Sequence, residues 1–377
     1  MNQRYAKITG WGKYVPERVL TNFDLEQMVD TSDEWITTRT GIKERRIRGE
    51  QDTTSSMAAA AGQQALETAG LQATDLDLII VATSSPDYIL PSVANKVQDL
   101  LGASCGAFSL VAGCSGWVYA LTTANQFIMS GTYNRVLVIG VEIVSFALDF
   151  TDRRTCVLFG DAAAATVLEV SYDPGGVLSF ELGSDGAKAE YLYVPDGGTV
   201  GPMSQRTVDE RRQFLRMNGA GLAKFALRTM PSSFKRTIYQ AGLTPDDVDL
   251  YIPHQSNVRL IEAAARQLRV PLEKFYINVD RYGNTSAAAV PLALVEAIEE
   301  GRIKDGDIVA MSAFGAGLTW ASVVMQMGEG EISAAHSLFS MGRARYLARR
   351  TSDAVIDTAQ SAFLPLYTFI NQRRKKK

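Results

Sequence analysis

Cysteine, histidine and long apolar runs are all scarce in this sequence of 377 residues. It has three cysteines, at positions 105, 114 and 156, and two histidines. An odd number of cysteines without close pairs does not form a disulfide framework, so we expect Cys105 and Cys156 to be buried thiols in a reducing compartment. The first residues have no apolar signal core, and the longest apolar runs, such as LIIVA and VLVIGV, have the length of strands. These absences argue against a secreted or membrane-spanning protein and favour a cytoplasmic one.

A large excess of one charge is also missing, because 38 lysines and arginines face 41 aspartates and glutamates, for a net charge of −3. The balance is uneven along the chain. Residues 328–377 hold nine basic and four acidic residues, which gives this tail a charge of +5 and leaves −8 on residues 1–327. An acidic body argues against nucleic-acid binding. The basic tail is a separate question.

The sequence repeats itself in three pairs of segments. With 46% hydrophobic residues, it can also form a large core. AGLQATDLDLIIVATS at 69–84 is similar to AGLTPDDVDLYIPHQS at 241–256, and both predict a helix end, a turn and a buried strand. GCSGWVYALTTANQFIMSG at 113–131 is matched in the same order by GNTSAAAVPLALVEAIEEG at 283–301, which aligns Cys114 with Asn284. NRVLVIG and DGDIVAMS add a buried strand to each half.

The repeat predicts two packed α/β units with buried sheets between layers of helices. We place the units at residues 1–172 and 173–327, followed by a basic extension at 328–377. Equivalent helix starts can face each other at the junction, which would bring Cys114 and Asn284 into one cleft. His254 follows the strand DLYIP and should point to the same cleft, because ligands gather at the carboxyl ends of such strands.

Cys114 lies between an apolar, strand-like approach and a segment with apolar residues at helical spacing, so it should stand at the start of a helix. The positive end of a helix dipole favours a thiolate, and we therefore expect a lowered pKa for this thiol. Gly113, Ser115 and Gly116 leave room for an incoming group. The alternative is that Cys114 is a small buried core residue.

VAGCSGW, PHQSNVRL and RYGNTSAAAVP resemble the Cys, His and Asn motifs of β-ketoacyl-acyl carrier protein synthase III, the condensing enzyme that starts type II fatty acid synthesis. TSDEWITTRTGI, TDRRTCVLFGDAAAA, LGSDG and AFGAGLTW resemble the same family in the same order, so the resemblance covers residues from about 4 to 327. It implies the thiolase-like fold, a duplicated five-layered αβαβα architecture. It also implies a homodimer without a metal or redox cofactor.

The resemblance implies a role for each of the three motif residues. Cys114 would take an acyl group from acyl-CoA, so that coenzyme A enters as part of a substrate. His254 and Asn284 would bind the thioester carbonyl of malonyl-acyl carrier protein and stabilise the enolate formed when carbon dioxide leaves. The carbanion would attack the acyl-Cys114 to give a 3-ketoacyl product, with the backbone N–H groups of Cys114 and Ala316 as the oxyanion hole.

Substrate-binding residues are carried over from the family in the same way. Coenzyme A is expected to contact aromatic, cationic and small residues, namely Trp35, Arg39, Arg153, Gly219 and Asn257. The acidic carrier protein is expected to dock on Lys224, Arg259 and Arg266. Any one of these arginines, taken alone, is more often a solvated surface charge.

Two departures from the family pattern concern the acyl pocket. Ala223 stands where the family usually has phenylalanine beside the tunnel, and Leu90 occupies a position that limits acyl length and reaches in from the partner subunit. We therefore expect the protein to accept primers longer or more branched than acetyl. Ser109 replaces a common aspartate, and no reason for this is visible in the sequence.

The extension at 328–377 is the third departure, since the family normally ends near Met327. Apolar pairs about two turns apart predict a helix over 333–364, up to Pro365. We expect this helix to pack on the body or the dimer, and the alternatives are disorder or a membrane or partner contact through FLPLYTFINQRRKKK. His336 is expected to be an ordinary surface histidine.

Two other functions remain open from the sequence. A synthase-III-like acyltransferase, or a condensing enzyme of secondary metabolism, would keep the Cys and His residues and use another acceptor. An inactive scaffold would bind acyl carrier protein without reacting, but the intact set of Cys114, His254 and Asn284 argues against it. A thiolase would need a second catalytic cysteine, and a hydroxymethylglutaryl-CoA synthase would need a catalytic glutamate.

Overall fold

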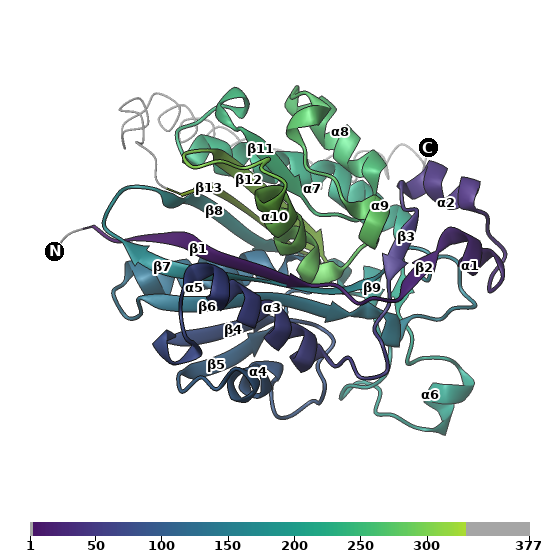
Figure 1. Cartoon of the computed structure of the whole chain (residues 1–377). Helices are drawn as coiled ribbons and strands as arrows, with labels where there is room; N and C mark the ends of the chain where they lie inside the picture. The colour runs from purple at the N-terminus through teal and green to yellow at the C-terminus, as the bar shows by residue number, and fades with distance from the viewer. Residues whose placement is uncertain (1–2, 329–377) are drawn as a thin grey trace, which may run out of the picture.

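Two β-sheets form the framework of the computed structural model, which describes residues 3–328 (Figure 1). The first sheet has the order β1 (Tyr5–Tyr14), β7 (Asp161–Ser171), β6 (Arg135–Ile143), β4 (Leu78–Ala82) and β5 (Gly106–Leu110). The second has the order β11 (Leu250–Pro253), β12 (Ile308–Gly315), β13 (Thr319–Gln326) and β8 (Gly176–Ser184). Residues 329–377, which hold the predicted C-terminal helix and His336, lie outside the described residues.

The two sheets repeat the same plan. The first sheet contains four neighbouring strands in the order β4, β6, β7 and β1. The second sheet has the corresponding order β11, β12, β13 and β8. In each set the first pair is parallel and the next two pairs are antiparallel. The internal repeat found in the sequence is therefore confirmed as a repeat of structure, with β5 as an additional strand on the first sheet.

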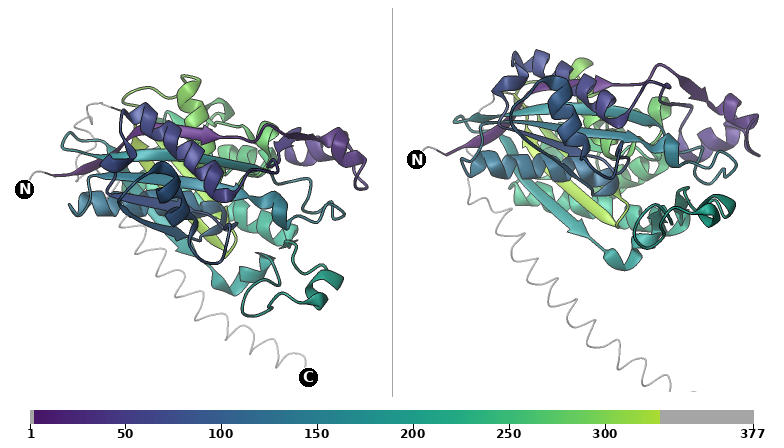
Figure 2. Two further views of the ribbon diagram at one scale, coloured as in Figure 1. Left: turned by 60° about the horizontal axis from the view of Figure 1, so that its bottom comes forward. Right: turned by 90° about the horizontal axis from the view of Figure 1, so that it is seen from below.

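Helices cover both faces of each sheet and produce five layers (Figures 1 and 2). α3 (Thr54–Ala69) and α4 (Val93–Leu101) pack on the outer face of the first sheet. α5 (Gly116–Met129) and α10 (Ala289–Glu299) lie between the sheets, and their apolar side chains share one core with both. α7 (Gly219–Gln240) and α8 (Val258–Leu268) cover the outer face of the second sheet. The predicted five-layered αβαβα architecture is confirmed.

The strand β4 shows why its sequence is continuously apolar. Leu78, Ile80 and Ala82 face the central helices, whereas Ile79 and Val81 face the outer layer. Successive side chains of a strand point to opposite faces, so a strand covered on both sides needs apolar residues at every position. All five residues of β4 are buried.

The remaining elements lie mostly near one end of the sheets. They are β2 (Val19–Thr21), α1 (Asn22–Glu26), α2 (Asp33–Thr40), β3 (Glu44–Arg46), β9 (Leu192–Tyr193), α6 (Gln205–Asp209), β10 (Arg216–Met217) and α9 (Val279–Tyr282). β2 pairs with β3, and β9 pairs with β10. Among the helices of residues 3–328, none combines the length and the apolar composition needed to cross a membrane.

Three smaller sequence expectations are answered by the fold. All three cysteines are free, and Cys156 is buried as predicted. Cys105 is only half-buried, because it lies in the bend just before β5 rather than inside the strand, so its predicted burial is wrong. Ser109 accepts a hydrogen bond from the backbone N–H of Ala94 (3.1 Å) with its Oγ and so ties the start of α4 to β5.

Candidate active site

Cys114 and Asn284 stand at equivalent helix starts, and the structure brings them together. A 3₁₀ turn, Gly113–Ser115, carries Cys114 into α5, and Ser286–Ala288 forms the corresponding turn before α10. Both side chains are buried, with 5% and 6% of their surface exposed. The two turns pack against each other, and hydrogen bonding from Asn284 and Ser286 lowers the pKa of the Cys114 thiol. The pairing predicted from the internal repeat therefore holds at the level of contacts.

The main chain of Asn284 is fixed from the first half of the molecule. Its backbone N–H donates to the carbonyl oxygen of Leu158 (2.8 Å), and its own carbonyl accepts from the N–H of Gly160 (3.1 Å). Its side-chain Oδ1 accepts from the N–H of Ser286 (2.9 Å). Because Oδ1 is occupied, the amide NH₂ group is the part of Asn284 that can serve as a donor.

The predicted lowering of the Cys114 pKa is wrong for this structure. The pKa of the thiol is raised to about 11, mainly by burial and also by the negative charge of Glu142, although hydrogen bonding from Ser286 and Asn284 opposes the rise. A helix start was visible in the sequence, but the depth of the thiol below the surface was not. Since desolvation disfavours the thiolate, the thiol needs a proton acceptor before it can act as a nucleophile at neutral pH.

His254 directly follows β11 and is almost completely buried, with 2% of its surface exposed. Its backbone N–H donates to the carbonyl oxygen of Ser312 in β12 (2.7 Å), and its ring lies edge-on to Phe314 at 5.0 Å. Burial lowers the pKa of His254 to about 3, so the imidazole is neutral at physiological pH. A neutral imidazole keeps one N–H group, as the predicted donor role requires.

The end of β12 connects His254 to Cys114. Phe314 packs on the His254 ring, and the next residue, Gly315, lies against the cysteine. A Cβ atom on Gly315 would stand 2.5 Å from the backbone nitrogen of Cys114, and one on Gly113 would stand 2.8 Å from that of Ala316. Two glycines thus allow the backbones of Cys114 and Ala316, the predicted oxyanion hole, to approach closely.

The predicted coenzyme-binding residues gather at a second, exposed place. The guanidinium groups of Arg39 and Arg153 lie over the ring of Trp35, at 4.9 and 5.3 Å from its centre. Asn257 donates from Nδ2 to the carbonyl oxygen of Arg39 (3.0 Å) and accepts the N–H of Arg259 at the start of α8 (2.9 Å). We call Trp35, Arg39, Arg153 and Asn257 the arginine cluster. Gly219 begins α7, the helix that packs along α8.

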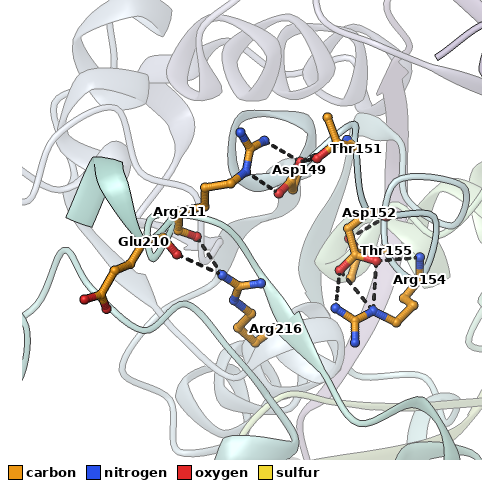
Figure 3. Close-up of polar contacts among 8 residues, drawn as sticks. All are labelled: Asp149, Thr151, Asp152, Arg154, Thr155, Glu210, Arg211 and Arg216. Atoms are coloured by element: carbon orange, nitrogen blue, oxygen red, sulfur yellow. Dashed lines mark hydrogen bonds and ion pairs between the residues drawn. The ribbon is translucent and has the colours of Figure 1, made fainter. Parts of the chain in front are cut away.

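The loop that carries Arg153 is held in shape by a network of charged groups (Figure 3). Arg211 donates to both carboxylate oxygens of Asp149 (2.7 and 2.5 Å), and Arg154 folds back onto Asp152 (2.8 Å). The hydrogen bonds from Arg211 hold the pKa of Asp149 well below its usual range. Arg216 in turn donates to the backbone carbonyl of Arg211 (2.9 Å). The loop before β7 is therefore anchored to the segment after α6.

The predicted acyl-pocket residues lie on different elements and differ in exposure. Ala223 is half-buried on α7, whereas Leu90 lies on the loop between β4 and α4 with 83% of its surface exposed. Two residues after Ala223, the buried ring of Phe225 packs edge-on against Phe314 and Trp320 (6.5 and 5.9 Å between ring centres). Phe225 therefore belongs to the core between α7 and the second sheet, whereas position 223 holds only a methyl group.

The three predicted docking residues are all exposed, Lys224 on α7 and Arg259 and Arg266 on α8. The two helices pack against each other. Arg266 approaches Glu262 one turn earlier on the same helix (3.8 Å), which neutralises part of its charge. Lys224 and Arg259 are the better candidates for contact with an acidic partner.

Sequence reasoning missed two residues of the site, Glu142 and Ser286. Glu142 is the last but one residue of β6 and is 2% exposed. Ser286 donates a hydrogen bond to it and lowers the pKa of the Cys114 thiol. The signal was present, because a glutamate inside the apolar run VLVIGVEIV is unusual. Elsewhere in residues 3–328, no group of three or more His, Cys, Asp or Glu side chains could hold a metal ion.

Two family models match this chain. Residues 108–186 match "3-Oxoacyl-[acyl-carrier-protein (ACP)] synthase III", and residues 238–327 match its C-terminal part. The first region contains Cys114, and the second contains His254 and Asn284. The two matches therefore fall on the two halves of the repeat and include all three motif residues.

Known proteins resemble the chain over most of its length. The β-ketoacyl-[acyl-carrier-protein] synthase III of Caldanaerobacter subterraneus is 52% identical over 85% of this chain and 97% of its own. That of Roseiflexus sp. strain RS-1 is 50% identical over 85% and 98%. The crystal structure of the 3-oxoacyl-[acyl-carrier-protein] synthase III of Aquifex aeolicus superposes with a TM-score of 0.80 at 47% identity, covering 85% of this chain and 99% of its own. The chain belongs to the β-ketoacyl-acyl carrier protein synthase III family.

Proposed function

We propose that this chain condenses an acyl-CoA primer with malonyl-acyl carrier protein, releases carbon dioxide and so starts fatty acid synthesis. The observation that carries the proposal is the meeting of Cys114 and Asn284 at paired helix starts, beside the end of β12 that packs on His254. It is supported by relatives named for this activity at 50% identity and more. The protein is thus an acyltransferase.

In the first half of the reaction, Cys114 takes the acyl group. Its sulfur attacks the thioester carbonyl of acyl-CoA, and the carbonyl oxygen gains negative charge between the backbone N–H groups of Cys114 and Ala316. Coenzyme A leaves as the carbon–sulfur bond to it breaks. The close approach permitted by Gly113 and Gly315 supports this assignment, because both donors belong to the main chain.

In the second half, His254 and Asn284 bind the thioester carbonyl of malonyl-acyl carrier protein. Their N–H groups stabilise the enolate that forms as carbon dioxide leaves. The carbanion attacks the acyl carbonyl on Cys114, and the 3-ketoacyl product departs on the carrier protein. The neutral state of His254 supports this role, since a buried imidazole with a pKa of about 3 is a donor and a poor base.

The substrates bind outside the buried site. The arginine cluster and Gly219 hold coenzyme A, by stacking on Trp35 and by charge-assisted bonds to phosphates. Lys224 and Arg259, with a smaller contribution from Arg266, guide the acidic carrier protein. No further cofactor takes part in this scheme.

Two copies of the chain form the working enzyme. The exposed side chains of Ile89 and Leu90 (85% and 83%) support such a dimer, in which Leu90 closes the acyl pocket of the partner subunit. Ala223 leaves space on the other side of that pocket, so longer or branched primers are accepted. The three free cysteines support a reducing compartment such as the cytoplasm.

The test is a panel of acyl-CoAs from acetyl to dodecanoyl, including branched primers, with wild type and Cys114→Ala in parallel. Intact mass should show one acyl group on the wild type and none on the variant, and malonyl-acyl carrier protein should then release a 3-ketoacyl product. Acylation without condensation would point to another acceptor, and no acylation by any primer would overturn the proposal. A clear preference for acetyl-CoA over all other primers would contradict the proposal that Ala223 widens the acyl pocket.

A further inference from the structure

Glu142 is a buried carboxyl group that the reaction described above does not use. It accepts hydrogen bonds from the backbone N–H of Ser84 (2.9 Å) and from the hydroxyls of Ser85 (2.7 Å) and Ser286 (3.3 Å). None of the ion pairs within residues 3–328 includes it. A buried carboxylate without a cation is costly, which makes its position beside the nucleophile informative.

Burial sets the proton affinity of this carboxyl group close to neutral. It raises the pKa of Glu142 to about 7, although the hydrogen bonds from Ser85, Ser84 and Ser286 lower it. The other titratable groups around it are few. Cys114 lies on the 3₁₀ turn, and Asp161 on β7 bonds instead with Ser145 and the backbone of Arg48. β4 and the turn Ser286–Ala288 contribute none.

Ser286 connects the carboxyl group to the nucleophile. Its hydroxyl donates to Oε1 of Glu142 (3.3 Å). The turn that carries it packs against the turn that carries Cys114, and hydrogen bonding from Ser286 lowers the pKa of the Cys114 thiol. A hydroxyl has one proton and two lone pairs, so it can accept from one neighbour while it donates to the other. Its backbone is fixed by the bond from its N–H to Asn284 Oδ1 (2.9 Å). This is the geometry of a proton relay.

The alternative proton acceptor, His254, is less suited to the task. Its pKa of about 3 lies further from the thiol pKa of about 11 than does the value of about 7 for Glu142. Transfer to imidazole would also create two opposite charges in a buried site. Transfer to a carboxylate only moves one existing negative charge, from oxygen to sulfur, and avoids that cost.

We propose that Glu142, acting through Ser286, accepts the proton of Cys114 during acyl transfer and returns it after condensation. The S–H proton moves to Ser286 Oγ as the proton of that hydroxyl moves to Glu142, and the freed sulfur pair forms the bond to the acyl carbon. Coenzyme A leaves as a thiolate and is protonated by solvent. When the carbanion expels Cys114 as a thiolate, the relay runs in reverse. This inference rests on the proposed function.

The experiment compares wild type with Glu142→Gln, Glu142→Asp and Ser286→Ala. A matched control is Ser233→Ala, which removes another buried serine that donates to a glutamate (Glu181, 3.1 Å) on the outer layer of the second sheet. The rate of acyl addition to Cys114 is measured by intact mass from pH 5.5 to 9.5. Alkylation of Cys114 by iodoacetamide is followed over the same range by peptide mass, because it does not depend on the condensing function.

Loss of a general base lowers the rate by about 10²-fold, so Glu142→Gln and Ser286→Ala should slow acylation by that factor at pH 7. The deficit should shrink as rising pH ionises the thiol directly. A double variant that combines Glu142→Gln with Ser286→Ala should be no slower than either single variant, because both changes remove the same relay. Glu142→Asp should recover part of the rate, and Ser233→Ala should match wild type.

A merely electrostatic role for Glu142 predicts the opposite sign. Because its charge raises the pKa of Cys114, removal of that charge alone would speed both acylation and alkylation at pH 7. Faster reactions in Glu142→Gln, or an unchanged pH profile in both variants, would overturn the relay. If Glu142→Gln does not fold, Ser286→Ala decides. If wild type takes no acyl group at all, the proposed function fails, and the alkylation profiles still test the relay.

Discussion

The buried site around Cys114 and the exposed arginine cluster around Trp35 differ in burial and in charge. Cys114, His254 and Asn284 expose 5%, 2% and 6% of their surface, and burial keeps the Cys114 thiol and the His254 imidazole neutral at physiological pH. Arg39 and Arg153 are exposed and permanently charged. The buried site therefore depends on geometry and proton position, and the cluster depends on charges that salt screens. Variants at the first should change the chemistry, and variants at the second should change binding.

The largest effect should come from His254→Ala. Loss of one buried donor to the enolate should slow condensation by about 10²- to 10³-fold, whereas acyl transfer to Cys114 should remain largely intact. Separate assays of acyl-enzyme formation and of 3-ketoacyl product measure the two halves. Because burial lowers the pKa of His254 to about 3, the wild-type condensation rate should show no loss from histidine protonation between pH 8 and pH 5.5. The measurement starts from preformed acyl-enzyme, so that protonation of Glu142 before acyl transfer does not enter. A sharp fall of the condensation rate near pH 6.5 would then contradict a buried neutral imidazole.

The next effect tests the close approach of two backbones. Gly315→Ala places a Cβ atom 2.5 Å from the Cys114 nitrogen, so the backbone must shift, and acylation should fall by about tenfold or more. Ala316→Gly is the matched control, since it keeps the N–H donor and should acylate at nearly the wild-type rate. Stopped reactions analysed by intact mass give both rates. Equal rates for the two variants would argue against a main-chain oxyanion hole.

Arg153→Ala should have a smaller effect, confined to binding. Loss of the guanidinium group beside Trp35 should raise KM for acyl-CoA by up to about tenfold with little change in kcat. Added salt should weaken the wild type more than the variant. Arg154→Ala is the neighbouring control, because Arg154 folds onto Asp152 (2.8 Å), whereas Arg153 lies over the ring of Trp35 (5.3 Å). A fall in kcat with unchanged KM would place Arg153 in the chemistry instead.

The smallest effect is expected at the carrier-protein surface. Arg259→Glu should raise KM for malonyl-acyl carrier protein by less than about fivefold, and the change should disappear in high salt. Arg266→Glu should do less, because Glu262 already shares its charge. Steady-state rates at two salt concentrations compare the pair. The proposed docking surface would be wrong if both variants behaved like wild type at low salt.

Much of the fold and part of the site could be predicted from the sequence, because both are encoded in local patterns. The segments around Leu78 and Leu250 repeat, and a second repeated pair, 113–131 and 283–301, places Cys114 opposite Asn284. The features that could not be predicted depend on how deeply a side chain is buried. A motif shows that a helix begins at Cys114, but only the packed structure shows that burial raises the pKa of this thiol.

The same reason explains the residues that were missed. Glu142 belongs to β6 and Ser286 to the turn before α10, far apart in the chain, and only the packing of the two halves brings them to Cys114. Ser109 is similar, since its bond to the start of α4 joins two elements that the sequence shows separately. Contacts between the two halves of the molecule cannot be predicted from local sequence patterns, except where the internal repeat aligns the two residues.

The buried carboxyl group of Glu142 also has a consequence for the stability of the fold. Its pKa is about 7 in the folded chain and near 4.5 when exposed in an unfolded one. The folded state therefore holds the proton more tightly, so this group makes the protein less stable as pH rises from about 4.5 to 7, and the full cost is present above pH 7. Glu142→Gln should accordingly melt at a higher temperature than wild type in alkaline buffer while losing activity. A residue that lowers the stability of the fold is expected to be kept where it serves catalysis.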